Sequence, residues 1–430
     1  MSSTGAHPST LKPTNTLIRY GLIGAAIAFA GPPIYIHAPK VYAQLHGLNL
    51  AVLGAVLLAL RAFDFVQDPL LGWAISKRPE SRSKLAIIFT ALLGAGMTAL
   101  FAPTLPLPPG IWIAISLALV FTGFSGLQIM FYSAGIGLAE SLKTTHSKIA
   151  AWRETSVLIG ICAACVAPVG FAAMTDEPTG YAIYAGAFLV LLITGLLLSR
   201  PVWTSPLPPQ QKKADYKTLL KDTPLRWLMG VGFLNSLPTG VTSTLFLFYV
   251  EDRLQGGFHA GPMLLIFFLS AALSAPFWGK MASKYNIKTV LLIGMSLVIP
   301  AFITASMLGS GDILAFYIIC IFSGITLGAD MTLLPAMISE RLAESGQSPS
   351  HAFGIFGFIT KMSFAVGAAI SLPLLAYAQY TPGDGNTEAS LRALALTYAA
   401  LPCVLKVFAI VGLKLAPIGS TKRRIEKVQP

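Results

Sequence analysis

The stretch Arg61-Ala-Phe-Asp64-Phe-Val-Gln67-Asp68-Pro-Leu-Leu-Gly72-Trp73 places one cation and two carboxylates inside a long apolar run that opens near Leu48. Ionised side chains at membrane depth are costly, and they usually face a bundle interior or a wet cavity that serves an ion or a substrate. At about 100° per residue, Arg61, Asp64 and Asp68 fall within about 60° of one helix face. Their excess negative charge predicts an ion site. The alternative is a buried charge cluster that only fixes helix packing.

The composition around this stretch is that of a polytopic membrane protein. The 430 residues are 54% hydrophobic and only 11% charged, and the mean hydropathy is +0.70. Apolar runs of roughly 20 residues each predict an all-α membrane protein with twelve transmembrane helices. Their approximate extents are 18–39, 49–75, 85–103, 111–137, 150–174, 180–199, 226–250, 260–283, 289–308, 313–339, 352–377 and 391–414.

The basic residues predict the orientation. If both termini are cytoplasmic, 24 of the 30 Lys and Arg fall on the cytoplasmic side, three on the opposite side and three in helices. The net charge of +12 is then spread over short cytoplasmic loops, so the bilayer is the expected partner and nucleic acid is not. Residues 1–16 lack a signal-peptide pattern and are expected to form a cytoplasmic tail. We expect a monomer in the plasma membrane, the inner membrane in a bacterium.

The sequence shows no pattern of a catalytic or metal site. We find no Ser/His/Asp arrangement, no phosphate-binding loop and no cluster of metal ligands. Cys162-x-x-Cys165 has the spacing of a redox motif, but it lies in an apolar run and is expected to pack in the core. Neither an enzyme nor a resident cofactor is expected.

The chain also predicts two similar halves. The long polar stretch between Arg200 and Arg226 separates a six-helix half (1–200) from a second (226–430) with a basic tail, and 201–225 is expected to be a cytoplasmic linker. The second and eighth helices end in the same pattern, P-x-x-G-x-x-x-S-K, 207 residues apart, and Gly126-Leu-Gln128 resembles Gly328-Ala-Asp330. The residues expected to gate the cytoplasmic side are Gly72, Ser76, Lys77, Gly279, Ser283 and Lys284.

The repeat fails at the charged residues of the second helix. A shift of 207 residues aligns Arg61, Asp64 and Asp68 with Phe268 and two alanines. A purely architectural requirement would leave some trace in both copies. The asymmetry therefore favours an ion site.

The motif Arg61-x-x-Asp64-x-x-Gln67-Asp68-Pro-x-x-Gly72 resembles the second-helix signature of the glycoside–pentoside–hexuronide:cation symporters, the melibiose-permease branch of the major facilitator superfamily. Supporting matches are Tyr20-Gly21, Phe131-Tyr-Ser133, Arg153, Gly328-Ala-Asp330 with Leu334-Pro335, and the segment around Lys361. The resemblance implies the major facilitator fold and symport of a small organic solute with a cation by alternating access.

The resemblance also implies where the coupling cation binds. The corresponding residues are Asp64, Asp68, Gln67 and Ser125, with Arg61 and Lys361 balancing the charge. Hard oxygen ligands suit Na⁺, while a carboxylate can carry H⁺ instead, so both ions remain open. Gln67 stands where the family often has Asn.

The solute site is less defined. The resemblance implies a pocket that includes Tyr132 and Arg153. Gln128, which can still form a hydrogen bond to a hydroxyl, and its repeat partner Asp330 are expected to contribute to the same pocket. The family's two sugar-binding carboxylates are replaced by Ala28 and Gln128, so a sugar, an organic anion, a peptide-like and a lipid-like solute all stay open. Two other functions also stay open: a proton-coupled exporter of drugs or lipid-like solutes, and a membrane sensor or assembly factor that transports nothing.

Two helices are expected to be interrupted. Gly31-Pro32-Pro33 lies in the first helix, and the segment Asn235 to Thr239 with Pro238 lies in the seventh. A broken backbone is tolerated at membrane depth where it lines a cavity.

Overall fold

The computed structural model describes residues 13–38, 41–42, 46–48, 50–102, 107–204, 219, 221–383 and 385–418, and over these residues it contains helices and no strand. Ten of the described helices are long and apolar enough to cross a membrane. The prediction of an all-helical, multi-pass membrane protein is confirmed. The expected runs 18–39 and 49–75 correspond to α1 with η1 and to α3, which are not among those ten.

The helices follow one another with short connections. The first part of the chain forms α1 (Pro13–Ala28), η1 (Pro33–His37), α3 (Leu50–Ser76), η2 (Pro79–Ser81), α4 (Arg82–Leu100), α5 (Pro109–Ser141), α6 (His146–Met174), α7 (Glu177–Leu198) and α8 (Arg200–Thr204). The second part forms α10 (Thr223–Phe248), η3 (Tyr249–Arg253), η4 (Gly257–His259), α11 (Ala260–Lys284), α12 (Ile287–Ile303), η5 (Thr304–Met307), α13 (Ile313–Ser345), α14 (Pro349–Tyr377) and α15 (Glu388–Leu415). Most of the predicted linker, 205–218 and 220, lies outside the described residues.

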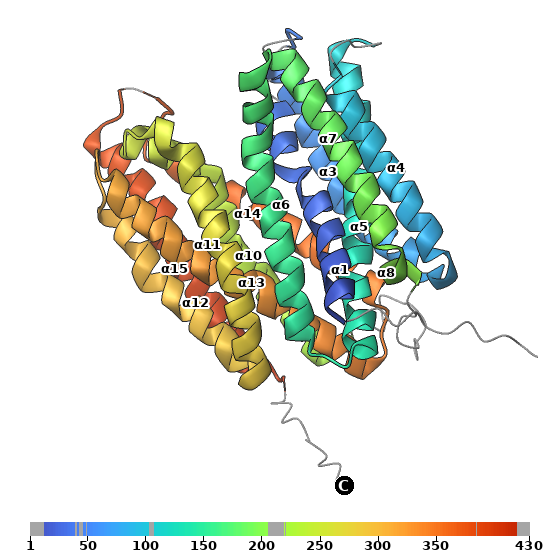
Figure 1. Ribbon diagram of the computed structural model, residues 1–430. Helices are drawn as coiled ribbons and strands as arrows, with labels where there is room; N and C mark the ends of the chain where they lie inside the picture. Colours follow the sequence, from blue (N-terminus) through green and yellow to red (C-terminus); the bar gives the residue numbers. More distant parts are fainter. Residues whose placement is uncertain are drawn as a thin grey trace, which may run out of the picture.

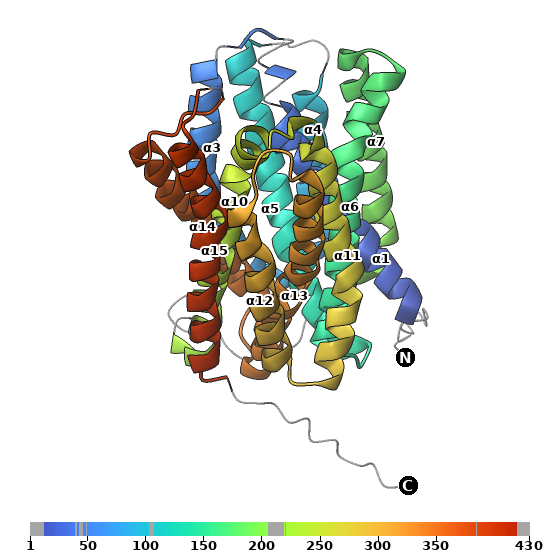
Figure 2. The ribbon, with the colours of Figure 1, turned by 90° about the vertical axis from the view of Figure 1, so that its left-hand side faces the viewer.

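The helices form two groups that lie side by side (Figure 1). The first helix group contains α1 and α3 to α8, and the second contains α10 to α15. One large hydrophobic cluster is built from residues between Leu17 and Trp203, and another from residues between Val241 and Ala399. A third cluster lies mainly in the second part of the chain and includes Ile136 of α5. Figure 2 shows the helices running along the long axis, with the start of α1 and the end of α15 toward the same end.

Polar capping residues explain why several helices begin a few residues before the apolar runs. Five residues each precede a helix, and the side chain of each accepts a hydrogen bond from a backbone N–H in the first turn: Thr145, Asp176, Asp222, Asn286 and Thr387. These bonds satisfy donors that have no partner within the helix. Hydropathy alone does not detect these capping residues, so the predicted starts of these helices lie two to four residues too late.

One of the two expected helix interruptions is present. α1 ends at Ala28, and the π-helix η1 follows after the Gly31-Pro32 step. The expected interruption of the seventh helix is wrong, because α10 continues through Pro238 to Phe248. A proline inside a helix removes one backbone hydrogen bond, which neighbouring groups in a membrane helix can offset.

Two glycine crossings join the helix groups. A Cβ added to Gly72 of α3 would lie 2.7 Å from the Ser350 carbonyl oxygen of α14, and one added to Gly279 of α11 would lie 2.5 Å from Cβ of Ala151 in α6. Only glycine permits backbones to approach this closely. The two crossings use the equivalent glycines of the predicted repeat, each packed against the opposite group.

Candidate functional site

The carboxylates of α3 face the boundary between the two helix groups. Asp64 and Asp68 lie one turn apart on α3, which packs against α5 of its own group and α14 of the other. Their exposed fractions are only 1% and 3%. The sequence places them on one face, and the structure confirms that they converge.

Lys361 of α14 supplies the positive charge at this point. Its Nζ lies 2.8 Å from Oδ2 of Asp64 and 2.9 Å from Oδ2 of Asp68, and it donates to Oγ of Ser125 at 3.0 Å. One ammonium therefore contacts three of the four side chains that the resemblance assigns to the coupling cation. The Lys361 side chain remains 18% exposed, so it reaches this site from accessible space.

Gln67 contacts one of the two carboxylates. Its Nε2 donates to Oδ1 of Asp64 at 2.7 Å, and its Oε1 accepts from the hydroxyl of Thr122 at 3.0 Å. The amide thus holds Asp64 in place from the side and directs its own oxygen toward α5. Thr122 was missed in the sequence, although it lies one helical turn before Ser125 and Gly126 on α5.

Among the described side chains, Asp64, Asp68 and Lys361 leave one excess negative charge. The side chain of Arg61 lies outside the described part of the structure, so its predicted charge-balancing role stays a prediction. A buried cluster with unbalanced charge is costly, and a bound cation or proton would relieve it.

Two of the predicted solute-binding residues form a second buried cluster. The guanidinium of Arg153 lies 3.9 Å from the ring centroid of Tyr132, and its Nε donates to Oε1 of Glu154 at 2.7 Å. The Tyr132 hydroxyl donates to the same oxygen at 3.1 Å, and its ring contacts Phe353 of α14. Glu154 was missed, because a carboxylate directly after an arginine near the start of a helix is usually a solvated pair.

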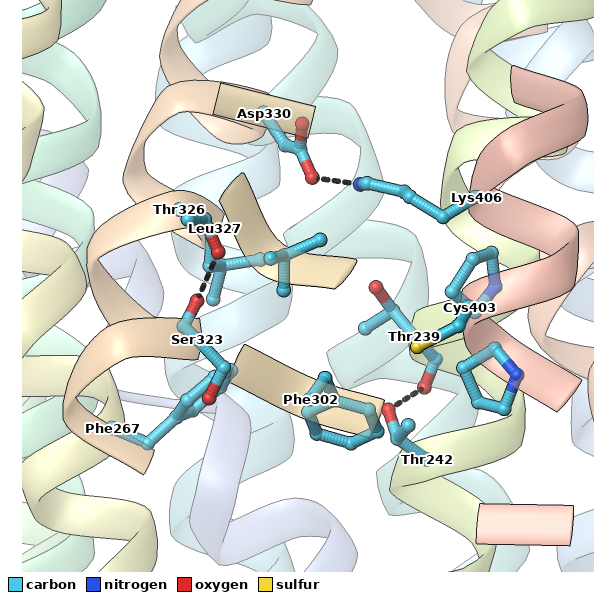
Figure 3. Close-up of a pocket in the computed structure, with 13 residues that line it drawn as sticks. Thr239, Thr242, Phe267, Phe302, Ser323, Thr326, Leu327, Asp330, Cys403 and Lys406 are labelled. Atoms are coloured by element: carbon cyan, nitrogen blue, oxygen red, sulfur yellow. Dashed lines mark hydrogen bonds and ion pairs between the residues drawn. The ribbon is translucent and has the colours of Figure 1, made fainter. Parts of the chain in front are cut away.

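The other two predicted solute residues lie elsewhere. Asp330 of α13 pairs with Lys406 of α15 (Figure 3). The Lys406 ammonium also donates to Oδ1 of Asn235 at 2.7 Å. Gln128 is half-buried on α5. The structure therefore brings Tyr132 and Arg153 together and places Asp330 in a separate cluster of the second helix group.

Two of the predicted gate residues, Gly72 and Gly279, form the glycine crossings, and the other four lie farther along, at the ends of α3 and α11. Ser283 shares a hydrogen bond of 3.0 Å with Thr145, which precedes α6 in the opposite group. Ser76 donates instead to the carbonyl of Trp73 at 2.7 Å, and Lys77 lies over the Trp73 ring. Lys284 lies over the ring of Tyr285.

Residues 17–420 match the family model described as MFS/sugar transport protein. The chain belongs to this family of the major facilitator superfamily. It is 25% identical to the sodium-dependent lysophosphatidylcholine symporter 1 of Gallus gallus, over 90% of this chain and 84% of that protein. It is 22% identical to YjmB, an uncharacterized symporter of Bacillus subtilis strain 168, over 91% of this chain and 89% of that one.

A solved structure supports the same fold for this major facilitator protein. A bacterial homologue of the iron transporter ferroportin, in an outward-facing state, superposes with a TM-score of 0.67 at 16% identity, over 94% of this chain and 98% of that one. The family resemblance seen in the second-helix motif is confirmed. The expected function, cation-coupled solute transport by a major facilitator protein, is also confirmed, while the comparisons do not identify the solute.

Proposed function

We propose that this protein is a Na⁺-coupled symporter in which Asp64 and Asp68 bind the ion in exchange for the Lys361 ammonium. One observation carries the proposal: the ammonium contacts Asp64, Asp68 and Ser125 at 2.8–3.0 Å, and it comes from the opposite helix group. These oxygens are the hard ligands that Na⁺ prefers. The sodium-dependent relatives favour Na⁺ over H⁺ as the coupling ion.

The exchange couples ion binding to movement. While Lys361 occupies the site, it ties α14 to α3, and the glycine crossing beside it is closed. A Na⁺ ion that enters between the carboxylates displaces the ammonium and releases this tie. The two helix groups are then free to move relative to each other, which is the step that alternating access requires.

The arrangement of the whole chain fits this cycle. We propose twelve membrane spans in two halves, with α1 plus η1 and α3 added to the ten apolar helices, and both termini in the cytoplasm. The crossings at Gly72 and Gly279 then close the cytoplasmic side. This conformation corresponds to an outward-facing state, and the protein acts as a monomer in the plasma membrane.

The solute is a small organic molecule, and the family description favours a sugar or glycoside. Tyr132 and Arg153 are the proposed contacts, but Arg153 is paired with Glu154 in this conformation. We propose that the solute accepts a hydrogen bond from the guanidinium beside Glu154, because an arginine can donate to several acceptors at once and Nη2 of Arg153 has no hydrogen-bond partner in the described part of the chain.

Uptake into reconstituted vesicles tests the proposal. A panel of labelled sugars, glycosides, organic anions and lysophospholipids is offered under an inward Na⁺ gradient, an inward H⁺ gradient or none. We expect accumulation of one class with Na⁺, and none in Asp68→Asn. Uptake driven by H⁺ alone would contradict Na⁺ coupling and favour H⁺ as the coupling ion. Export of the solute would contradict symport into the cell. Full accumulation by Asp68→Asn would show that Asp68 has no part in the mechanism.

A further inference from the structure

A cavity lies inside the second helix group, and none of its lining residues belongs to the Asp64–Lys361 cluster. It has a volume of about 80 Å³, and its lining comes from α10, α11, α12, α13 and α15. Figure 3 shows Asp330 and Lys406 at one end of this cavity and the Phe267 and Phe302 rings toward the other. The cavity is thus polar at one end and ring-lined at the other.

Three hydroxyl groups on its wall donate their protons to backbone carbonyls. Ser323 donates to the Ile319 carbonyl at 2.6 Å, Thr326 to the Ser323 carbonyl at 2.8 Å, and Thr242 to the Thr239 carbonyl at 3.2 Å. A hydroxyl has one proton to donate, so these groups can offer a ligand only their lone pairs. A bound molecule that brings its own donor can therefore bond to these oxygens.

Asp330 offers the strongest acceptor. Its Oδ2 is taken by the Lys406 ammonium, while its Oδ1 is buried and has no hydrogen-bond partner in the described part of the chain. A buried acceptor without a partner is costly, and native structures usually satisfy it with protein, water or ligand. This oxygen is the natural partner for a donor in the cavity.

The net charge at this end limits the ligand. Asp330 and Lys406 neutralise each other, so an added cation would meet the ammonium and an added anion would meet the carboxylate. A neutral hydroxyl avoids both repulsions and supplies the missing donor. The aromatic rings favour an apolar body for the remainder of the molecule.

We propose that this cavity is a second ligand site, which binds a small uncharged molecule with an apolar body and one hydroxyl group that donates to Oδ1 of Asp330. The site is separate from the ion cluster, and it does not rest on the proposed transport cycle.

Cys403 provides a direct reporter, because it lines the same cavity. The test uses the full chain with Cys403 as its single cysteine and the other three replaced by Ala. A matched chain keeps only Cys165, which is half-buried on α6 of the first group. The rate of modification by N-ethylmaleimide is measured with benzyl alcohol, with toluene at equal concentration in the detergent phase, and with neither.

We expect benzyl alcohol to slow modification of Cys403 and to leave Cys165 unchanged. Toluene lacks the hydroxyl, so its apparent affinity should be about tenfold lower, the equivalent of one hydrogen bond to a charged group. In Asp330→Asn the side-chain oxygen can still accept a hydrogen bond from Lys406, but an amide NH₂ replaces the unpartnered oxygen and cannot accept one. In that variant the advantage of benzyl alcohol over toluene should disappear, while modification of Cys403 without ligand continues at a similar rate.

Four results would overturn the proposal: no modification of Cys403 under any condition, equal protection by the two compounds, equal protection of Cys165, or an unchanged preference in Asp330→Asn. The last variant is compared only if its melting temperature and gel-filtration profile match those of the parent chain, and otherwise the double variant Asp330→Leu with Lys406→Met replaces it. That variant removes both members of the ion pair, so it leaves no unpaired charge, and the preference for benzyl alcohol over toluene should disappear in it as well.

Discussion

Replacement of Asp68 by asparagine separates ion binding from folding. In the wild type both carboxylate oxygens of Asp68 lie near the Lys361 ammonium, at 2.9 and 3.1 Å. The asparagine side chain has the same shape, and it can still accept one hydrogen bond. Lys361 also keeps Asp64 at 2.8 Å and Ser125 at 3.0 Å, so the variant leaves no buried ammonium without a partner.

The expected magnitudes differ strongly for the two properties. Removing one partner of a buried pair outright costs about 3–5 kcal/mol, and the remaining contacts of Lys361 should keep the loss of stability below that. For Na⁺ binding, Asp68→Asn removes one full negative charge from the site. At an effective dielectric constant of about 20, that charge contributes about 4 kcal/mol at about 4 Å, or roughly a thousandfold in affinity.

Thermal unfolding in NaCl against choline chloride measures this difference without knowledge of the solute. A ligand that binds only the folded state adds about 2.7 kcal/mol at a concentration of about 100 times its Kd. The wild type should gain this stabilisation, and Asp68→Asn should show none over the same range. Asp330→Asn is the matched control, because it changes a carboxylate that also pairs with a lysine in the other helix group. An unchanged Na⁺ response in Asp68→Asn would refute the assignment.

Three further predictions follow from the same contacts. Lys361→Met removes the ammonium that competes for the site, so the apparent affinity for Na⁺ in the same unfolding assay should rise while Na⁺-driven accumulation is lost; a fall in affinity would contradict the exchange. Gly72→Ala places a methyl group 2.7 Å from a backbone oxygen of α14, so disulfide crosslinking between cysteines introduced at the ends of α3 and α14 should fall, whereas Gly186→Ala, with open space around it, should change nothing. Glu154→Leu leaves Arg153 buried without its partner, so it should lower the free energy of unfolding by about 3–5 kcal/mol. Arg153→Met combined with Glu154→Leu should recover most of this stability while abolishing solute uptake. A double variant as unstable as the single one would show that packing, not charge, determines the stability here.

The sequence predicts the ion cluster well because the relevant signal is local. Asp64 and Asp68 are four residues apart in one apolar helix, so helical periodicity alone places them together. The partner is harder to locate, since Lys361 lies almost 300 residues away. The sequence nevertheless indicates it, because the segment around Lys361 resembles the eleventh helix of the symporter family, and a lysine in an apolar helix needs a carboxylate partner.

The solute residues show the limit of the same reasoning. Asp330 was assigned to the solute pocket as the repeat partner of Gln128, yet it pairs with Lys406, whose role the sequence did not indicate. Helical periodicity gives a residue's face but not which neighbouring helix covers that face. That choice depends on packing among α10, α13 and α15, and no pattern within a single helix encodes it.

The two buried lysines differ in one respect that bears on mechanism. Lys406 pairs with Asp330 inside the second helix group, so a rigid movement of that group carries both charges together and leaves their distance unchanged. Lys361 pairs with Asp64 and Asp68 across the boundary, so the same movement must stretch or break its contacts. Only a charge pair of the second kind can make the energy of a conformational change depend on whether an ion is bound. A carrier that works by this exchange therefore needs excess carboxylates in only one helix group, provided that the lysine that neutralises them belongs to the other group. The predicted repeat agrees with this requirement, because Phe268, Ala271 and Ala275 stand at the positions that correspond to Arg61, Asp64 and Asp68.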